Sequence, residues 1–335
     1  MSVLLSTLGE SPAVVTEAID KLLAEGVEIK YVDLLTTKDS EAQAAMEFLY
    51  AHIPRYYGEK IQFINLVGPK RINAFQDIDN DDAIVEFLEG ACLALQNCLK
   101  NRWKAYVSIA GGRKTMSALL TLAVQFYGAT SLFHIVVDDQ KIEEMGKISK
   151  LRNLPEEEQN RYLHPPPEKI KLIPLPFIGL FPMLDRIVSC LKGKADPEIE
   201  SLLEQNNLLQ KGKPTGLGRK ILGILEKVKS APKPRSGDCE VKIKKDEPKE
   251  TEATRKYMNC LRSLIFVKKI ESIGWAPGKP RVEQEPPNKL KVYLPGERIS
   301  ANIGLLLTTT AESKGELDYA EDLTKRFLKE RRLLT

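Results

Sequence analysis

The sequence predicts an α/β fold with a parallel sheet, followed by a basic linker and helical segment and a small α+β unit. Strand-like and helix-like apolar patterns alternate over about the first 140 residues, which is typical of a parallel sheet covered on both faces. The alternation ends after Asp139, and the stretch from Lys192 to Glu250 is rich in lysine and proline. Beyond it, helical patterns flank two strands that meet at a Pro295-Gly296 turn.

In the first part, the predicted elements follow one another in a regular order. Strands are expected at Val3–Thr7, Val27–Leu35, Ile61–Val67, Tyr106–Ile109 and Leu132–Val137, because each is a short apolar run. Helices are expected at Pro12–Glu25, Glu41–Ala51, Asp82–Leu99 and Thr115–Tyr127, where apolar residues recur at helical spacing. A further helix at Met183–Leu191 would close this domain.

The remainder of the chain predicts a linker and a second domain. Leu217–Val228 has the pattern of a basic amphipathic helix, either packed into a core or available to a partner, and Ala231–Glu250 is expected to be a linker. The last domain is expected to contain helices at Thr251–Ile273 and Leu317–Arg332 and strands at Lys289–Leu294 and Ile299–Thr309.

The composition limits the possible classes of protein. With 335 residues, of which 42% are hydrophobic and 29% charged, two or three domains can each bury a core. A net charge of +4 does not by itself identify nucleic acid as a partner. The five cysteines form no CxxC pair, which disfavours a zinc ribbon and a disulfide framework. No apolar run approaches the ~20 residues of a membrane span. We therefore expect a cytoplasmic protein with no metal site and no membrane contact.

The motif Ala110-Gly-Gly-Arg-Lys-Thr-Met-Ser117 joins a predicted strand to a predicted helix. Gly111 and Gly112 allow a tight turn and the close approach of a ligand, and Arg113 and Lys114 bring two cations to a helix N-terminus, which favours anions. The spacing matches neither a Walker loop nor a dinucleotide fingerprint. The motif predicts a phosphate-binding turn, and an ordinary βα turn with solvated basic residues is the alternative.

The loop Ser6–Pro12 follows the first predicted strand in the same way. Gly9 permits a tight bend, Ser11 is a suitable N-cap, and Pro12 suits the first helical position. Ligands bind at the carboxyl ends of strands in open α/β sheets, so both loops should lie on one rim. Ser11 could simply cap its helix, or its hydroxyl could point into the same crevice as Lys114.

The pairing of strand–TLGxSP–helix with strand–GGRKTMS–helix resembles the CARF domains of type III CRISPR systems, over about residues 1–190. These domains are Rossmann-like homodimers that bind cyclic oligoadenylates across the dimer two-fold axis. The resemblance implies ligand contacts by Thr7, Gly9, Ser11, Gly111, Gly112, Arg113 and Lys114. Some such domains also cleave the ring slowly, by bringing a ribose 2′-hydroxyl onto the adjacent phosphate, and Ser11 and Lys114 occupy suitable positions for that reaction.

A sensor of this kind needs an output domain. A HEPN ribonuclease is disfavoured, because its motif needs a histidine and the histidines His52, His134 and His164 all precede residue 190. The triplet Asp238-x-Glu240-x-Lys242 superficially resembles the core of a PD-(D/E)xK metal nuclease, but a charge-rich linker produces such triplets by chance.

The C-terminal part, about residues 251–335, resembles a RelE-type toxin. The family motif K-x-K, turn, G-x-R covers Lys289, Lys291, Gly296 and Arg298, and a tyrosine-containing helix follows. The resemblance implies RNA cleavage without metal, in which preorganised cations stabilise charge on phosphorus. Lys289 or Lys291 would be the base or charge stabiliser, and the resemblance does not decide between the two. A phosphate clamp of Arg298 and Lys314 and a nucleotide-stacking Tyr319 complete the expected catalytic set, with a solvated basic sheet face as the alternative.

The two resemblances together predict a CARF sensor at 1–190, a basic linker with an amphipathic helix at 191–250, and a RelE-like ribonuclease at 251–335. The expected protein is a homodimer that needs no cofactor and is activated by cyclic oligoadenylate, with cyclic tetra-adenylate as the expected ring. Its expected substrate is mRNA on the ribosome. The alternatives are a ring nuclease that degrades cyclic oligoadenylate, a CARF-gated transcription regulator, and a PD-(D/E)xK nuclease.

Overall fold

The computed structural model describes residues 1–64, 75–243, 252–296 and 302–334. The chain divides into two compact units, the first ending at Val228 and the second beginning at Lys229. The boundary lies inside the segment 191–250, so that segment is shared between the two units. Arg298 of the predicted catalytic set lies outside the described residues.

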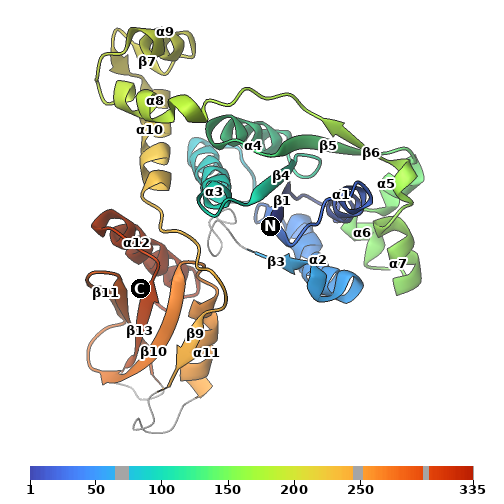
Figure 1. Ribbon diagram of the computed structural model, residues 1–335. Helices are drawn as coiled ribbons and strands as arrows, with labels where there is room; N and C mark the ends of the chain where they lie inside the picture. The colour runs from blue at the N-terminus through green and yellow to red at the C-terminus, as the bar shows by residue number, and fades with distance from the viewer. Residues whose placement is uncertain (65–74, 244–251, 297–301, 335) are drawn as a thin grey trace. The chain divides into compact units, whose positions relative to one another are not determined.

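A six-stranded sheet forms the centre of the first unit (Figure 1). Its order is β3-β2-β1-β4-β5-β6, and every neighbouring pair is parallel except β5 and β6, which are antiparallel. The predicted α/β class with a mostly parallel sheet is therefore confirmed, and the sheet carries one antiparallel edge. The strands are β1 (Ser2–Thr7), β2 (Tyr31–Leu35), β3 (Gln62–Phe63), β4 (Lys104–Ser108), β5 (Ser131–Val137) and β6 (Ile170–Pro174).

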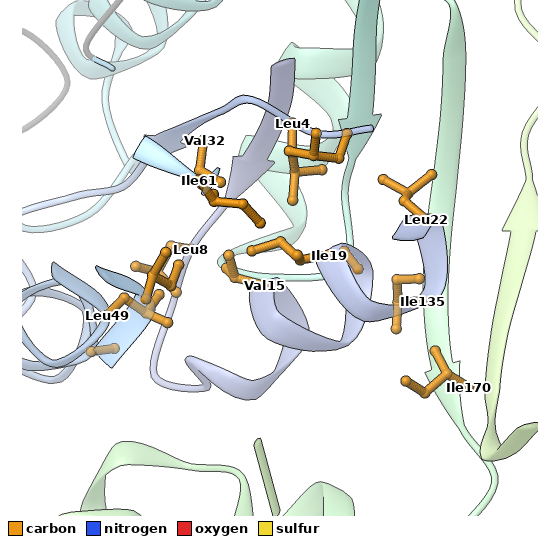
Figure 2. Close-up of a cluster of buried hydrophobic side chains, with 14 of the residues drawn as sticks. Leu4, Leu8, Val15, Ile19, Leu22, Val32, Leu49, Ile61, Ile135 and Ile170 are labelled. Atoms are coloured by element: carbon orange, nitrogen blue, oxygen red, sulfur yellow. The ribbon is translucent and has the colours of Figure 1, made fainter. Parts of the chain in front are cut away.

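Helices cover both faces of this sheet. α1 (Ala13–Ala24) and α2 (Ser40–Tyr57) lie on one face, and α3 (Asp81–Lys100) and α4 (Lys114–Tyr127) pack together on the other (Figure 1). Figure 2 shows the core beneath the first pair, where side chains of both helices meet those of β1, β2 and β5. Because helices cover both faces of the sheet, the strands are short, nearly continuous apolar runs.

Three short helices follow β5, namely α5 (Gln140–Met145), α6 (Ile148–Leu151) and α7 (Glu156–Leu163). After β6 come α8 (Leu184–Leu191), α9 (Pro197–Gln205), a hairpin of β7 (Leu209–Gln210) and β8 (Lys213–Pro214), and α10 (Gly216–Lys229). The apolar stripe of α10 is buried, and Lys227 forms a 3.2 Å ion pair with Glu89 of α3. Of the two interpretations of this amphipathic helix, the structure supports packing into a core.

The second unit is a five-stranded sheet in the order β11-β12-β13-β10-β9. Its strands are β9 (Glu240–Lys242), β10 (Val267–Ala276), β11 (Arg281–Glu285), β12 (Lys289–Pro295) and β13 (Asn302–Thr309), and its helices are α11 (Glu252–Arg262) and α12 (Lys314–Glu330). The predicted helix over Thr251–Ile273 is wrong in its second half, because the chain from Val267 pairs as a strand with β13 and β9.

Among the described residues, none of the helices combines the length and the apolar character that crossing a bilayer requires.

Candidate functional site

The two predicted loops meet at the carboxyl ends of β1 and β4, which are neighbours in the sheet. The Thr7 hydroxyl donates a 2.6 Å hydrogen bond to the Gly111 carbonyl oxygen. A Cβ atom at Gly111 would lie 2.4 Å from the Thr7 carbonyl oxygen, and one at Gly9 would lie 2.9 Å from Gly112 Cα. Gly112 also has a φ of +79°, a conformation that favours glycine. The glycines are therefore needed because two backbones touch here.

A cavity of about 440 Å³ opens beside these loops. Its walls come from four segments: the loop after β1, the loop after β2, the glycine turn after β4, and the α5–α6 region after β5. The lining residues include Gly9, Glu10, Ser11, Thr37, Asp39, Glu41, Gly111, Gly112, Arg113, Met116, Glu143 and Lys147. Loops that follow parallel strands thus converge on one pocket, as the rule for open α/β sheets requires.

The α5–α6 wall is tied directly to the first loop. The Ser11 hydroxyl donates to the Gly146 carbonyl oxygen at 3.1 Å, and the Ile148 amide donates to the Glu10 carbonyl oxygen at 2.8 Å. Lys147 Nζ lies 2.8 Å from Glu10 Oε1, and this hydrogen-bonded pair raises the pKa of Lys147. Sequence reasoning missed Lys147, because it lies in a polar stretch with no motif. The only available signal was its position after the strand β5.

Arg113 is the other cation of the cavity. Its Nη2 lies 3.8 Å from Asp39 Oδ2 and 3.5 Å from Asp77 Oδ2. Asp39 is also the N-cap of α2, since its Oδ1 accepts from the amides of Glu41 and Ala42 at 3.1 Å each. These side chains are about half exposed, so the ion pairs are weak and can exchange partners with a bound anion at little cost.

The predicted ligand-binding residues fall into two groups. Gly9, Ser11, Gly111, Gly112 and Arg113 line the cavity. Thr7 is fully buried beneath them and holds the two loops together. Lys114, the first residue of α4, is exposed and does not line the cavity. The structure therefore brings most of the predicted set together, with Lys147 closer to the pocket than Lys114.

The described members of the predicted catalytic set do not share one surface. Lys289 and Lys291 alternate along β12 with the fully buried Leu290 and Val292, so the two lysines belong to the opposite face of the sheet. Tyr319 is buried on α12.

Helix α12 covers the other face of this sheet. Gln284, which pairs in register with Leu290, donates to Asp318 and Glu321 of α12 at 2.7 and 2.6 Å. Tyr319 is thus separated from the two lysines by the sheet, and Lys314 lies exposed at the start of α12.

The lysine-bearing sheet face is balanced in charge rather than basic. Lys291 pairs with Glu285 at 3.0 Å, and Lys269 pairs with Glu271 at 2.7 Å. On the strands β11 and β9, further pairs join Arg281 to Glu283 at 2.7 Å and Lys242 to Glu240 at 2.8 Å. Several cations of this face are therefore already paired with carboxylates, and the RelE-type interpretation stays a prediction from sequence.

The PD-(D/E)xK-like triplet gains no support either. Asp238 is exposed and lies 3.8 Å from Arg262, while Glu240 and Lys242 pair with each other on the edge strand β9. In the part of the chain that the structure describes, no group of three or more histidine, cysteine, aspartate or glutamate residues has a metal-binding arrangement.

A buried polar cluster lies outside the cavity. His52 of α2 and His164 at the end of α7 contact each other through their Nε2 atoms at 2.8 Å. His164 Nδ1 lies 2.8 Å from Asp20 Oδ2 of α1, and the Tyr57 hydroxyl donates to Asp20 Oδ1 at 2.6 Å. Burial above all, and then the neighbouring His164, lower the pKa of His52 to about 4. The cluster joins three helices and is structural.

These features together define a pocket at the carboxyl ends of the strands of a Rossmann-like sheet. Residues 11–208 match the family described as CRISPR-associated protein NE0113. The match covers more than half of the chain, and the chain therefore belongs to this CRISPR-associated family.

Two individual proteins are similar to this chain to different degrees. The CRISPR system ring nuclease SSO2081 of Saccharolobus solfataricus is 27% identical over 155 residues, which cover 46% of this chain and 82% of that protein. Protein VC1899 from Vibrio cholerae is 8% identical with a TM-score of 0.30, over 92% of this chain and 78% of that chain. The second similarity is too low to carry an argument.

Proposed function

We propose that the first unit binds cyclic oligoadenylate in the cavity between the β1 and β4 loops and cleaves it, as a ring nuclease. The observation that carries this proposal is the pocket itself. Tight glycine loops, the N-terminus of α4 and the cations Arg113 and Lys147 converge there, which suits a ligand with several phosphates. Membership of a CRISPR-associated family and the similarity to a named ring nuclease support the same ligand class.

The chemistry of such a cleavage needs few groups. The ribose 2′-oxygen attacks the adjacent phosphorus, the bond from phosphorus to the 5′-oxygen breaks, and the proton of the 2′-hydroxyl ends on the departing 5′-oxygen. The product is an opened chain with a 2′,3′-cyclic phosphate. In this pocket, Arg113 and Lys147 would exchange their carboxylate partners for phosphate oxygens and stabilise the developing charge, while the rigid loops orient the ring.

A second copy of the chain would complete the site. Helix α4 begins at the pocket and contains no charged residue from Thr115 to Tyr127. Ala118 on this helix is exposed, and Leu119 and Leu122 are only partly buried. A charge-free, partly exposed helix face is typical of a surface that another protein covers. We therefore propose a homodimer with α4 in the interface, so that a ring could lie across the two-fold axis.

The test of ring cleavage compares cation variants. Arg113→Ala and Lys147→Ala should each slow the cleavage of cyclic tetra- or hexa-adenylate at least 10-fold, a loss typical of removing a group that stabilises transition-state charge. The products are separated by chromatography after incubation with purified protein. Lys141→Ala, an exposed lysine of α5 that does not line the cavity, is the matched control and should retain the wild-type rate. Wild-type protein that leaves both rings intact, or equal rates in all three variants, would contradict the proposal.

The RelE-type mRNA ribonuclease of the second unit stays a prediction from sequence. Its antiparallel sheet and terminal helix are present, but the separation of Tyr319 from the lysines weighs against it. Ring cleavage by the first unit is therefore the function that the geometry supports better.

A further inference from the structure

Glu41 is the one acidic residue of the cavity wall with a buried oxygen that lacks a hydrogen-bond partner among the described residues. It occupies the first turn of α2, which begins at Ser40 after the N-cap Asp39, and it lines the cavity. Its Oε2 atom is buried. Removing a carboxylate oxygen from water without giving it a donor is costly, so such an atom in a pocket indicates a missing donor.

The neighbouring acids already have partners. Asp39 accepts two amide hydrogen bonds and lies near Arg113, and Glu10 is paired with Lys147. Glu41 Oε2 thus differs from these acids, because it has no hydrogen-bond partner among the described residues. Water in the open cavity can donate to this oxygen, and a ligand that displaces the water must supply a donor in its place.

The chemistry of the ligand identifies that donor. A phosphate oxygen would be repelled by the carboxylate, whereas a hydroxyl or an amine can donate to it. Glu41 also follows β2 at its carboxyl end, next to the β1 loop. In nucleotide-binding parallel sheets, an acidic residue in this topological position accepts a hydrogen bond from a ribose hydroxyl.

We propose that Glu41 accepts a hydrogen bond from a ribose 2′-hydroxyl of the bound ring, so that the pocket selects ribonucleotides over 2′-deoxyribonucleotides. This inference rests on the proposed function, because it assumes that the ring binds in this cavity. Glu41 is a specificity residue in this account. It discriminates because a 2′-deoxy ring leaves the buried oxygen without a donor, and sites with such a group reject the analogue strongly.

The experiment measures binding rather than cleavage. Dissociation constants are determined by calorimetry for cyclic tetra- and hexa-adenylate, and the ring that binds better is then compared with its all-2′-deoxy analogue. Wild-type protein should bind the ribose ring about 10- to 100-fold more tightly than the deoxy ring, in line with a hydrogen bond to a charged group. In Glu41→Ala the ratio should fall to within about threefold of unity, mainly through weaker binding of the ribose ring.

Two further variants sharpen the result. Glu47→Ala changes an exposed glutamate on the same helix and should keep the wild-type ratio. Glu41→Gln keeps the shape of the side chain and should give an intermediate ratio, which covers the case of an alanine variant that fails to fold. The thermal midpoint of each unliganded variant is measured alongside.

The outcomes separate the two proposals. An unchanged ratio in both Glu41 variants, with tight ring binding, overturns the role of Glu41 and leaves the proposed function intact. Equal loss of affinity for both rings also overturns it, and points to a base amine as the donor. A wild-type protein that binds neither ribose ring overturns the proposed function, and the inference falls with it.

Discussion

At the scale of single residues, the pocket depends on three positions that carry no Cβ atom. Gly9, Gly111 and Gly112 let the β1 and β4 loops pack backbone against backbone. The identity of these residues is the part of the site that sequence predicted best, because a glycine motif at a strand–helix junction has a steric cause. Lys147 and Glu41 could not be predicted in the same way, since a charged residue in a polar stretch gives no local signal.

The steric requirement leads to a prediction for Gly111→Ala. The added methyl group would lie 2.4 Å from the Thr7 carbonyl oxygen, so the two loops must separate. We expect ring binding to weaken at least 10-fold and the thermal midpoint to fall by several degrees, as a strained core substitution of about 1–3 kcal/mol would cause.

The matched control is Gly223→Ala on α10. A Cβ atom there meets nothing within 4 Å, so the change should leave binding unaltered and raise helix stability by up to about 1 kcal/mol. Calorimetric binding and thermal melts measure both effects. Wild-type binding by Gly111→Ala would contradict the steric argument.

At the scale of elements, one cluster of polar side chains joins helices that are distant from each other in the chain. The contact between His52 and His164 joins α2 to the end of α7, and Asp20 adds α1. Helix α1 begins at the pocket loop, and the α5–α6 wall immediately precedes α7. Sequence patterns predicted most helices and strands of the first unit, but not this cluster, because its members are distant in the chain.

The cluster predicts an acid-sensitive region. The pKa of His52 is lowered to about 4 in the folded protein, against about 6.5 in an unfolded chain. The unfolded state therefore binds the proton more readily, and stability that is present above pH 6.5 is lost as the pH falls through 4. The charged neighbours Arg55, Glu156 and Asp20 act on the same imidazole.

His52→Gln removes this titration while keeping a polar side chain. We expect the thermal midpoint of the variant to fall less steeply than that of the wild type between pH 6.5 and pH 4. His134→Gln on β5, outside the cluster, is the control and should follow the wild-type curve. Parallel curves for all three proteins would show that His52 does not determine the acid response.

At the scale of the whole molecule, the two units were not equally predictable. The first was anticipated because alternating buried strands and amphipathic helices dictate a parallel sheet. In the second, the stretch 267–273 was mistaken for helix, since its strand character depends on pairing with β13 and β9. The balance of charge on its sheet could not be predicted from Lys289 and Lys291 alone, because Glu285, the partner of Lys291, lies on β11, a strand that the patterns missed.

The division into units predicts separable functions. The double variant Lys289→Ala and Lys291→Ala alters only the second unit, so ring binding and ring cleavage should stay within twofold of wild type. The same protein is then tested in a translation reaction with and without the ring. If the RelE-type prediction holds, ring-dependent inhibition by wild type should disappear in the double variant. Inhibition that persists, or that never appears in wild type, would exclude these lysines as an RNA-cleaving centre.

The acidic side chains of the cavity wall also determine how quickly a ligand can arrive. Among the described residues that line the cavity, the four acids Glu10, Asp39, Glu41 and Glu143 outnumber the cations Arg113 and Lys147. These acids weaken the attraction that the two cations of the wall exert on an approaching polyanion, so electrostatic steering by the wall itself is reduced. Tight binding must then come from slow dissociation. Selection among polyanions by such a pocket would depend on how long each one remains bound.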